Sequence, residues 1–356
     1  MTVLFGRQYS REQILSHVGD LLQVAGTRMM ELRDGLENGV RIADVRTGSG
    51  LRFQVSLDRG MDISMAEYKG TPLAFRSANG DVHPHRFEPE GSGWSRGFAG
   101  GLMTGCGMSN VGSSCVDEGE ALGQHGRLSM LPATAVRHGL RWQGDECVIE
   151  LSGEIREATP FRENLLLRRT IETRLGESAI TLRDVVRNEG DGNTPLMMLY
   201  HVNAGWPMVG EGARLFFRGA RTEPRDADAR AGLADAGIFS SPVPGYREQV
   251  FYHTLSAAAD GFATAMITDA HRDLGLFVRY RQAELPCFIE WKMMGHRYYA
   301  VGLEPANCRV EGRARERAAG TLQFLAPGEE RHFLVQIGVL EGENALRQFT
   351  DQNGLQ

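Results

Sequence analysis

The feature that most constrains the fold is a series of short stretches in which apolar residues occupy every second position. The alternating stretches are Arg41–Arg46, Arg52–Leu57, Glu146–Leu151, Leu166–Leu175 and Ala179–Val186. Turns rich in Gly, Asn and Asp separate them, and the chain has 44 glycines. A period of two bounded by such turns is typical of half-buried antiparallel strands. We therefore expect an all-β, mainly antiparallel fold, a large sandwich or barrel.

Helical signals are few. Ser10–Val18 near the start and Glu343–Gln352 at the end are the two candidates, and Gly176–Ser178 is the expected turn of a hairpin. No β-α-β alternation indicates a Rossmann fold, and no low-complexity linker or clear repeat divides the chain. We predict a single domain over residues 1–356, with residues 1–38 as an N-terminal extension that packs on it.

Two long stretches interrupt the strand pattern. Ser77–Gly119 is rich in Gly, His, Pro and Ser, and Glu223–Gly245 is rich in Arg, Asp, Ala and Pro. Loops of this length in a compact domain usually serve a function or cover a site. We expect both to lie near a binding cleft.

Composition and charge argue against several classes of partner. The 356 residues carry a net charge of −6 with no basic block, so neither nucleic acid nor an anionic membrane surface is an expected partner. No apolar run has the length of a membrane span, and Met1–Asp20 lacks the apolar core of a signal peptide. The five cysteines are odd in number and lack close paired spacing, which argues against a disulfide framework or a zinc knuckle. We expect a reduced, cytoplasmic enzyme without a metal.

Two apolar runs end in a group that can move a proton. His201 follows Pro195–Tyr200, and Glu304 follows Tyr299–Leu303 and precedes Pro305. Histidine titrates near neutral pH, and a partly buried carboxylate has a raised pKa that suits a general base. Each residue alone also has a structural interpretation, a histidine bonded to a backbone carbonyl and a glutamate in a salt bridge.

Three further residues could hold a substrate. Asn203 lies two positions after His201 and therefore on the same face of a strand. His125 stands between two glycines, which let the backbone approach a ligand closely. Arg59 has a guanidinium suited to vicinal hydroxyls or a carboxylate. A solvated turn is the structural alternative for His125 and Arg59.

A tryptophan and the two oppositely charged residues that flank it are the next candidates for substrate binding. Trp291 lies between Glu290 and Lys292 in a segment that favours a strand. An indole face commonly receives the C–H surface of a sugar, although it is also common in plain cores. The pair His83 and His85 resembles a metal motif, but two histidines in a polar loop usually bind no metal.

In chain order, these segments resemble the aldose 1-epimerase (galactose mutarotase-like) superfamily, and most closely its DUF4432 branch. The resemblance extends from about Arg41 to Gly338 and is strongest over Leu165–Pro207, where a hairpin, a turn and the His201 strand follow in the family's order. Leu303-Glu304-Pro305 and His125-Gly126 match two further segments of the family.

The resemblance implies a β-supersandwich with a sugar bound in an open cleft across one sheet. His201 would be the general acid that protonates the ring oxygen, and Glu304 the general base that takes the proton of the anomeric hydroxyl. His125 and Arg59 would hold sugar hydroxyls. No nucleotide, metal or other cofactor is implied.

One family feature has no clear counterpart, the aspartate that holds the substrate. The nearest candidate is Asp226, which follows Arg225. Arg225, with Arg59, Arg279 and Lys292, would make the cleft more cationic than a neutral hexose needs. We therefore hypothesise a sugar that carries a carboxylate, sulfonate or phosphate.

Two other functions are compatible with the same residues. The acid–base pair could epimerise a carbon next to a carbonyl in a ketose or keto-acid, which would incorporate solvent deuterium at carbon. Alternatively, the scaffold could be a carbohydrate-binding module or sensor, because fold does not fix function. The presence of both His201 and Glu304 favours an enzyme, since a binder needs no paired acid and base.

Overall fold

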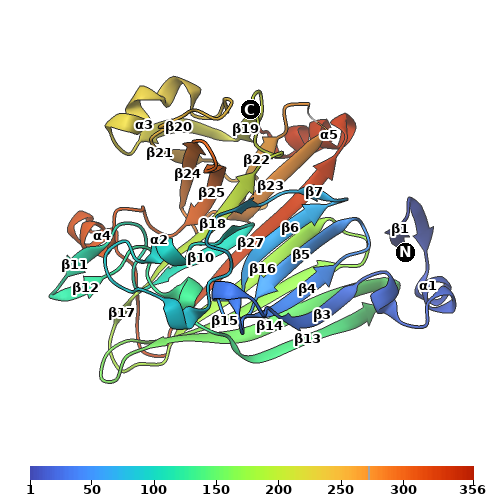
Figure 1. The fold of residues 1–356 in the computed structure, drawn as a ribbon, viewed down its shortest axis with the longest axis horizontal. Coiled ribbons are helices and arrows are strands. Elements are labelled where there is room, and N and C mark those ends of the chain that lie inside the picture. The colour runs from blue at the N-terminus through green and yellow to red at the C-terminus, as the bar shows by residue number, and fades with distance from the viewer. Residues whose placement is uncertain (272) are drawn as a thin grey trace.

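The computed structural model describes residues 1–271 and 273–356 and consists mainly of two antiparallel β-sheets packed face to face (Figure 1). We call them the large sheet and the small sheet. In the described residues they contain eleven and eight strands.

The large sheet carries the candidate site. Its strands, in spatial order, are β20 (Gly219–Pro224), β21 (Gln249–Leu255), β24 (Cys287–Met294), β25 (Tyr299–Ala306), β18 (Met197–Gly205), β10 (Met103–Met108), β6 (Asp62–Tyr68), β5 (Leu51–Ser56), β4 (Arg41–Arg46) and β3 (Gly26–Glu31), with β7 (Thr71–Pro72) beside β6. Strands far apart in sequence therefore meet at its centre, where β18 lies between β10 and β25.

The small sheet is built mostly from hairpin neighbours. Its strands, in spatial order, are β13 (Thr134–Gln143), β14 (Glu146–Ala158), β15 (Asn164–Arg174), β16 (Ala179–Asn188), β27 (Glu330–Glu341), β23 (Leu274–Arg281), β22 (Phe262–Thr268) and β19 (Arg214–Phe217). All five predicted alternating stretches fall in strands to within one residue, namely β4 and β5 of the large sheet and β14, β15 and β16 of the small sheet. The turn Gly176–Ser178 joins β15 to β16 as predicted.

Short elements surround the two sheets. Two-stranded pairs are β1 (Thr2–Leu4) with β2 (Arg7–Tyr9), β8 (Phe75–Arg76) with β9 (Gly100–Gly101), β11 (Cys115–Asp117) with β12 (Glu120–Leu122), and β17 (Thr194–Pro195) with β26 (Phe324–Leu325). The α-helices are α1 (Arg11–His17), α2 (Trp94–Gly97), α3 (Ala227–Ala231), α4 (Arg313–Ala319) and α5 (Glu343–Asn353), and 3-10 turns cover Leu21–Gln23, Gly35–Glu37, Pro84–Arg86, Leu128–Met130 and Leu233–Asp235. Both predicted helices, α1 and α5, are present. Within the described residues, no helix combines the length and apolar character needed to cross a membrane.

One apolar core fills the space between the sheets. Val55 and Met198 of the large sheet and Leu167 and Ile337 of the small sheet belong to the same buried cluster. A smaller apolar cluster lies on the opposite, outer face of the large sheet, beneath the loops, and includes Trp94. Alternate residues of β18 therefore enter two different environments, and both are buried.

The prediction that Ser77–Gly119 is loop was wrong for Met103–Met108, which forms the central strand β10. Its Gly-rich sequence has a low strand propensity, but β18 leaves no room for a side chain at Gly107. A Cβ on Gly107 would lie 2.1 Å from the carbonyl oxygen of Met197 on β18. Close packing of β10 against β18 therefore requires glycine.

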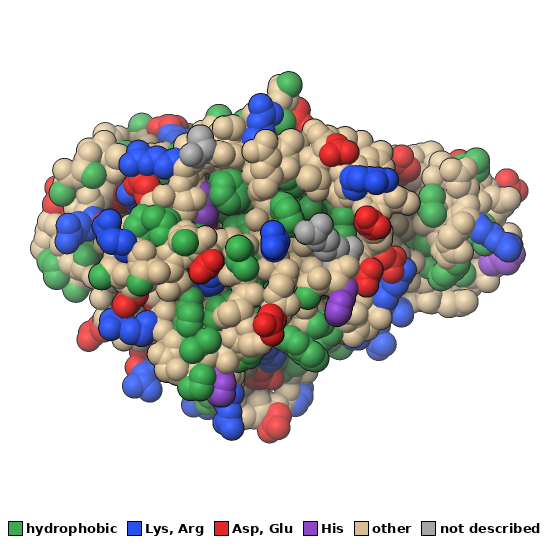
Figure 2. Space-filling model, turned by 90° about the horizontal axis from the view of Figure 1, so that it is seen from above, with side chains coloured by type: hydrophobic (Ala, Val, Ile, Leu, Met, Phe, Trp, Pro, Cys, Tyr) green, Lys and Arg blue, Asp and Glu red, His purple; other side chains and the backbone are tan. Residues whose placement is uncertain are grey.

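The N-terminal segment packs on the sandwich at the end far from the β11–β12 hairpin and α4 (Figure 1). Leu4 and Ile14 belong to the core between the sheets, and the Thr2 hydroxyl donates to the carbonyl of Asp145 at 2.7 Å. On the face drawn in Figure 2, basic and acidic side chains are interspersed, without a large area of one sign.

Candidate active site

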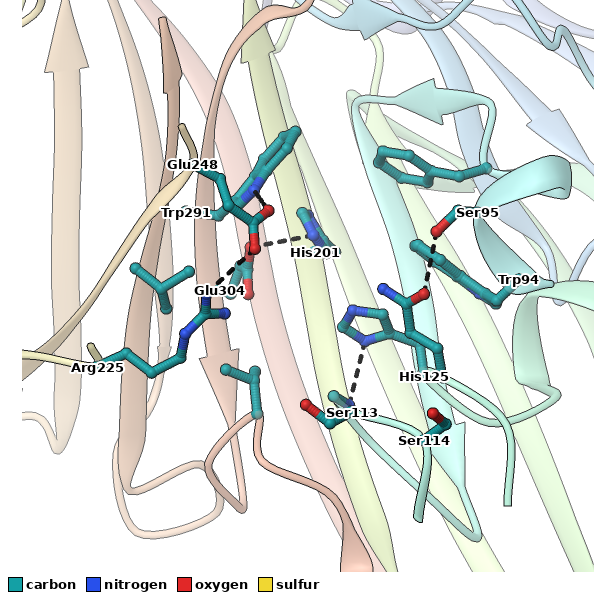
Figure 3. Close-up of a pocket in the computed structure, with 15 residues that line it drawn as sticks. Trp94, Ser95, Ser113, Ser114, His125, His201, Arg225, Glu248, Trp291 and Glu304 are labelled. Carbon is teal, nitrogen blue, oxygen red and sulfur yellow. Dashed lines mark hydrogen bonds and ion pairs between the residues drawn. The ribbon is translucent and has the colours of Figure 1, made fainter. Parts of the chain in front are cut away.

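A cavity of about 550 Å³ opens on the outer face of the large sheet, over β18, β24 and β25. Figure 3 shows His201 and Glu304 between a wall that contains Arg225, Glu248 and Trp291 and a wall that contains Trp94 and His125. The lining residues are Trp94, Ser95, Phe98, Gly112, Ser113, Ser114, Gln124, His125, His201, Arg225, Glu248, Val250, Trp291, Glu304 and Val310. Both long stretches singled out in the sequence contribute to this lining.

The pairing of β18 with β25 brings His201 and Glu304 together. In this antiparallel register Val202 is opposite Leu303 and Asn203 is opposite Gly302, so His201 and Glu304 face the cleft while Val202 and Leu303 face the core. Nε2 of His201 lies 3.1 Å from Oε1 of Glu304, and the two side chains are only 7% and 2% exposed.

Burial opposes charge on both members of this pair. It lowers the pKa of His201 to about 3, with a further contribution from His125. It also raises the pKa of Glu304 well above its ordinary value, with a further contribution from Glu248. The pair therefore retains one mobile proton around neutral pH, either on the carboxyl group or on the imidazole. Nδ1 of His201 and Oε1 of Glu304 are both buried, and apart from the contact between Nε2 and Oε1 neither atom has a hydrogen-bond partner among the described residues.

His125 approaches the same floor from the opposite wall. Its ring centroid lies 5.9 Å from that of His201, and its backbone is left-handed at φ 54°. The N–H of Gly112 donates to its Nδ1 at 3.3 Å, which leaves the proton of the neutral ring on Nε2. Burial lowers the pKa of His125 to about 4. His125 therefore enters the cleft as a neutral hydrogen-bond donor.

Aromatic side chains form the apolar part of the walls. Trp94 and Phe98 stack with centroids 4.7 Å apart, and Phe98 and Trp291 each lie 5.5 Å from the ring of His201. Such rings exclude water and offer flat surfaces to the C–H groups of a sugar.

A chain of charged groups borders the mouth of the cleft. Glu248 accepts a hydrogen bond from Nε1 of Trp291 at 2.9 Å and one from Arg225 at 3.1 Å. Arg225 also donates to Asp226 at 2.8 Å. Burial alone would lower the pKa of Arg225, but its bonds to Asp226 and Glu248 raise it. One guanidinium is thus shared between two carboxylates, and the rim gains no surplus positive charge from it.

The model of DUF4432, a domain of unknown function, matches residues 37–339. The chain belongs to the DUF4432 family. The resemblance inferred from the sequence is therefore confirmed. No curated protein matches the chain.

Solved structures share the fold of this DUF4432 protein at low sequence identity. A "putative aldose 1-epimerase" from Klebsiella pneumoniae is 23% identical, with a TM-score of 0.88 over 92% of this chain and 86% of that chain. A galactose mutarotase-like protein from Clostridium acetobutylicum is 13% identical (TM-score 0.62; 90% and 100% covered). A galactose 1-epimerase from Lactobacillus acidophilus is 14% identical (TM-score 0.56; 90% and 100% covered). The predicted fold class, a galactose mutarotase-like β-supersandwich, is confirmed.

Two of the predicted binding residues, Glu290 and Lys292, lie on the face of the large sheet that is turned away from the cleft. Side chains alternate along β24, so Trp291 faces the cleft while Glu290 and Lys292 face away from it. Glu290 lies 2.8 Å from Nε2 of His253, and Nζ of Lys292 donates to the carbonyls of Asp235 and Ile238. Glu290 thus contacts the neighbouring strand β21 and Lys292 the loop between β20 and β21, and neither contributes to the cleft.

Two predicted arginines also lie elsewhere. Arg59 is 2% exposed and donates to the carbonyls of Val82 and Gly97, each at 2.6 Å. Arg279 is on β23 of the small sheet and pairs with Asp260. Neither side chain lines the cleft, and Asp226 reaches it only through Arg225.

Asn203 remains beside the pair without lining the open volume. It is fully buried, and its carboxamide donates to the carbonyl of His201 at 2.9 Å. Its Oδ1 has no partner among the described residues. This bond fixes the local conformation of β18 next to the histidine.

The sequence reasoning missed several lining residues of the DUF4432 protein. Trp94 and Phe98 were aromatic residues in a predicted functional loop, a signal that could have identified them. Glu248 lies just beyond the second stretch, and only the pairing of β21 with β24 brings it to Trp291. Among the described residues, no group of three or more His, Cys, Asp or Glu side chains is arranged to hold a metal ion.

Proposed function

We propose that this DUF4432 protein is an aldose 1-epimerase, a mutarotase that interconverts the anomers of a neutral sugar by general acid–base catalysis. The observation that carries the proposal is the buried pair His201 and Glu304, 3.1 Å apart on the floor of the cleft. The names of the three structural neighbours suggest this reaction class, and at their low sequence identities the neighbours themselves show only the fold.

The reaction fits one acid and one base placed side by side. Glu304 removes the proton of the anomeric hydroxyl as His201 delivers a proton to the ring oxygen, and the bond between the anomeric carbon and the ring oxygen breaks. Both oxygens belong to one carbon, which matches the short separation of the two catalytic groups. The open aldehyde rotates, and the reverse transfers close the ring in the other configuration. The pair ends each turnover with the single proton it began with.

This assignment requires the ionised form of the pair, with the proton on His201. Burial favours the neutral form in the free protein. Transfer of one proton from Glu304 to His201 converts one form to the other without exchange with solvent. A polar sugar that hydrogen-bonds both groups stabilises the ionised form, because hydrogen bonds to a charged group are stronger than those to a neutral one.

The remaining lining residues suit the binding of an uncharged polyol. His125 offers a neutral N–H to a ring or hydroxyl oxygen. Trp291, Trp94 and Phe98 cover the C–H surface. Glu248 accepts from sugar hydroxyls, and Arg225 donates to them.

The cationic cleft expected from the sequence is absent among the described residues. Of the four basic residues on which it rested, Arg59, Arg279 and Lys292 lie outside the lining, and Arg225 is shared between Asp226 and Glu248. A carboxylate or phosphate on the substrate would meet Glu248 without a free counter-charge. We therefore favour a neutral sugar over the acidic one.

Anomer exchange measured by proton NMR tests the proposal directly. Pure anomers of neutral hexoses and of their uronic acids would be followed with the wild type, His201→Gln and Glu304→Gln, with Glu150→Gln on the outer face of the small sheet as the matched control. We expect acceleration of neutral-sugar exchange by the wild type and the control. Loss of one catalytic group should reduce the rate by about 10²–10⁴-fold.

Three results would contradict the proposal. Deuterium incorporation at carbon in D₂O would indicate epimerisation next to a carbonyl. Tight sugar binding by the wild type without exchange would indicate a sensor. Equal or better turnover of uronic acids would remove the argument for a neutral substrate.

A further inference from the structure

A polar cluster lies directly behind the acid–base pair, in the space between the two sheets. It consists of Arg169 on β15, Asp184 on β16, Tyr200 on β18 and Asp62 on β6. Their exposed fractions are 0%, 1%, 0% and 3%, so all four are buried in a layer that is otherwise apolar. None of them lines the cleft.

Hydrogen bonds within this cluster connect the two sheets. Arg169 donates to both carboxylate oxygens of Asp184, with its shortest bond at 2.6 Å, and to the carbonyl of Gly60 at 2.7 Å. The hydroxyl of Tyr200 donates to the same Asp184 carboxylate at 2.7 Å, and the guanidinium lies 5.8 Å from the centre of the Tyr200 ring. The small sheet is therefore hydrogen-bonded to β18 through the side chain of Tyr200.

Asp62 holds the neighbouring strand. Its Oδ1 accepts the backbone N–H of Gly105 on β10 at 2.8 Å, and Gly105 is opposite Tyr200 in the β10–β18 register. β6 and β10 pair at one position only, Met103 with Ile63, so the Asp62 side chain takes the place of a missing strand bond. The cluster thus fixes both strands at the position of His201.

Stability alone does not account for such a cluster. A buried ion pair is costly to desolvate, and apolar residues of similar volume often replace it without loss. What apolar residues do not supply is a directed bond that fixes one orientation of a strand. Tyr200 and His201 are consecutive and point to opposite faces of β18. A rotation of Tyr200 would therefore turn the peptide group between the two residues and move the imidazole relative to Glu304.

We propose that Tyr200, held by Asp184 and Arg169, is a positioning residue for His201. This inference rests on the proposed function. Misplacement of a catalytic group by about 1 Å can reduce a rate by about 10²-fold, so a smaller shift of the imidazole should be visible in kcat. Because the cluster does not contact substrate, KM should change little.

Tyr200→Phe tests the proposal, with Tyr280→Phe as the matched control. Tyr280 on β23 is also in the core between the sheets, 1% exposed and stacked on Phe288, and the described residues offer no hydrogen bond to its hydroxyl. Two measurements are made on each variant: anomer-exchange kinetics, and the ring resonances of His201 in the free protein, assigned with His201→Gln.

For Tyr200→Phe we expect kcat to fall about three- to tenfold, with KM within twofold of the wild type. The His201 resonances should shift, whereas Tyr280→Phe should leave kcat and the resonances unchanged. The double variant Arg169→Met with Asp184→Leu leaves the Tyr200 hydroxyl and the Gly60 carbonyl without these partners, so it should lose more activity and some stability; if it does not fold, the single variant decides.

Unchanged kcat and unchanged His201 resonances in Tyr200→Phe would overturn the proposal, whatever the change in thermal midpoint. A wild type without anomer exchange would defeat the proposed function instead. In that case the resonances of the free protein still decide whether Tyr200 positions the imidazole.

Discussion

At the residue scale, the arrangement of His201 and Glu304 depends on Gly302, a residue of β25 that lies opposite Asn203 of β18. A Cβ on Gly302 would lie 2.4 Å from Oε1 of Glu304 and 3.2 Å from Cε1 of His201. The nearest atom is the end of a flexible side chain, so an added methyl group should displace the carboxylate rather than unfold the sheet.

We therefore predict that Gly302→Ala reduces kcat about 10²-fold, the scale of a 1 Å misplacement, with little change in thermal midpoint. Gly139→Ala on β13 is the matched control, because a Cβ there meets no atom within 4 Å. Kinetics and thermal unfolding of both variants check the prediction. A variant that loses stability while keeping its activity would show that the carboxylate is not displaced.

The pH dependence of activity follows from the same pair. Its second proton binds only near the pKa of His201, about 3, and its single proton leaves only near the raised pKa of Glu304. We expect kcat/KM to be flat from neutral pH down to about pH 5 and to fall on the alkaline side. Exchange rates corrected for the spontaneous reaction measure this profile. A decrease near pH 6.5 on the acid side would indicate a solvent-exposed histidine instead.

Part of the site predicted from the sequence reaches the cleft, although His201 and Glu304 lie inside β18 and β25 rather than at the strand ends expected from the sequence. His201, Glu304, His125, Trp291 and Arg225 all line the cleft. The basic residues could not be sorted in the same way, because a shift of one position along a strand reverses the face that a side chain occupies. Only the register of β24 in the sheet shows that Trp291 faces the cleft while Glu290 and Lys292 face away from it.

At the scale of the elements, the alternating strands and the apolar runs of β18 and β25 were predictable from the sequence, whereas the central strand β10 was not. β14, β15 and β16 each have a polar face and an apolar face, which is the pattern that sequence reasoning detects. β10 is buried on both sides and rich in glycine, so it carries neither alternation nor strand propensity. Its place depends on neighbours that are distant in sequence.

Asp62, which fixes β10, gives this element a pH-dependent stability. Burial raises the pKa of Asp62 to about 7, against the bonds of Gly105 and the charge of Arg169, and its Oδ2 has no partner among the described residues. The pKa of Asp62 is higher in the folded than in the unfolded protein. Its contribution to the free energy of unfolding is therefore fully present below about pH 4 and is lost as the pH rises toward 7. Three pKa units correspond to at most about 4 kcal/mol.

Asp62→Asn should therefore remove this decline, since the amide oxygen still accepts from Gly105 and carries no charge. Urea unfolding between pH 4.5 and 8 would compare the variant with the wild type. A slope that is the same in both proteins would mean that Asp62 does not titrate in this range.

At the scale of the whole molecule, the N-terminal segment should unfold together with the sandwich. Leu4 is 3% exposed and belongs to the same core as Leu167 and Val335, whereas its neighbour Phe5 is 76% exposed. Leu4→Ala should lower the free energy of unfolding by about 2–4 kcal/mol in one cooperative transition. Phe5→Ala should change it by less than about 0.5 kcal/mol. Neither should alter kcat, because the segment lies at the end of the molecule away from the β11–β12 hairpin (Figure 1). A separate early transition in Leu4→Ala, with the main midpoint unmoved, would show that the segment is an independent unit and contradict the single domain predicted from the sequence.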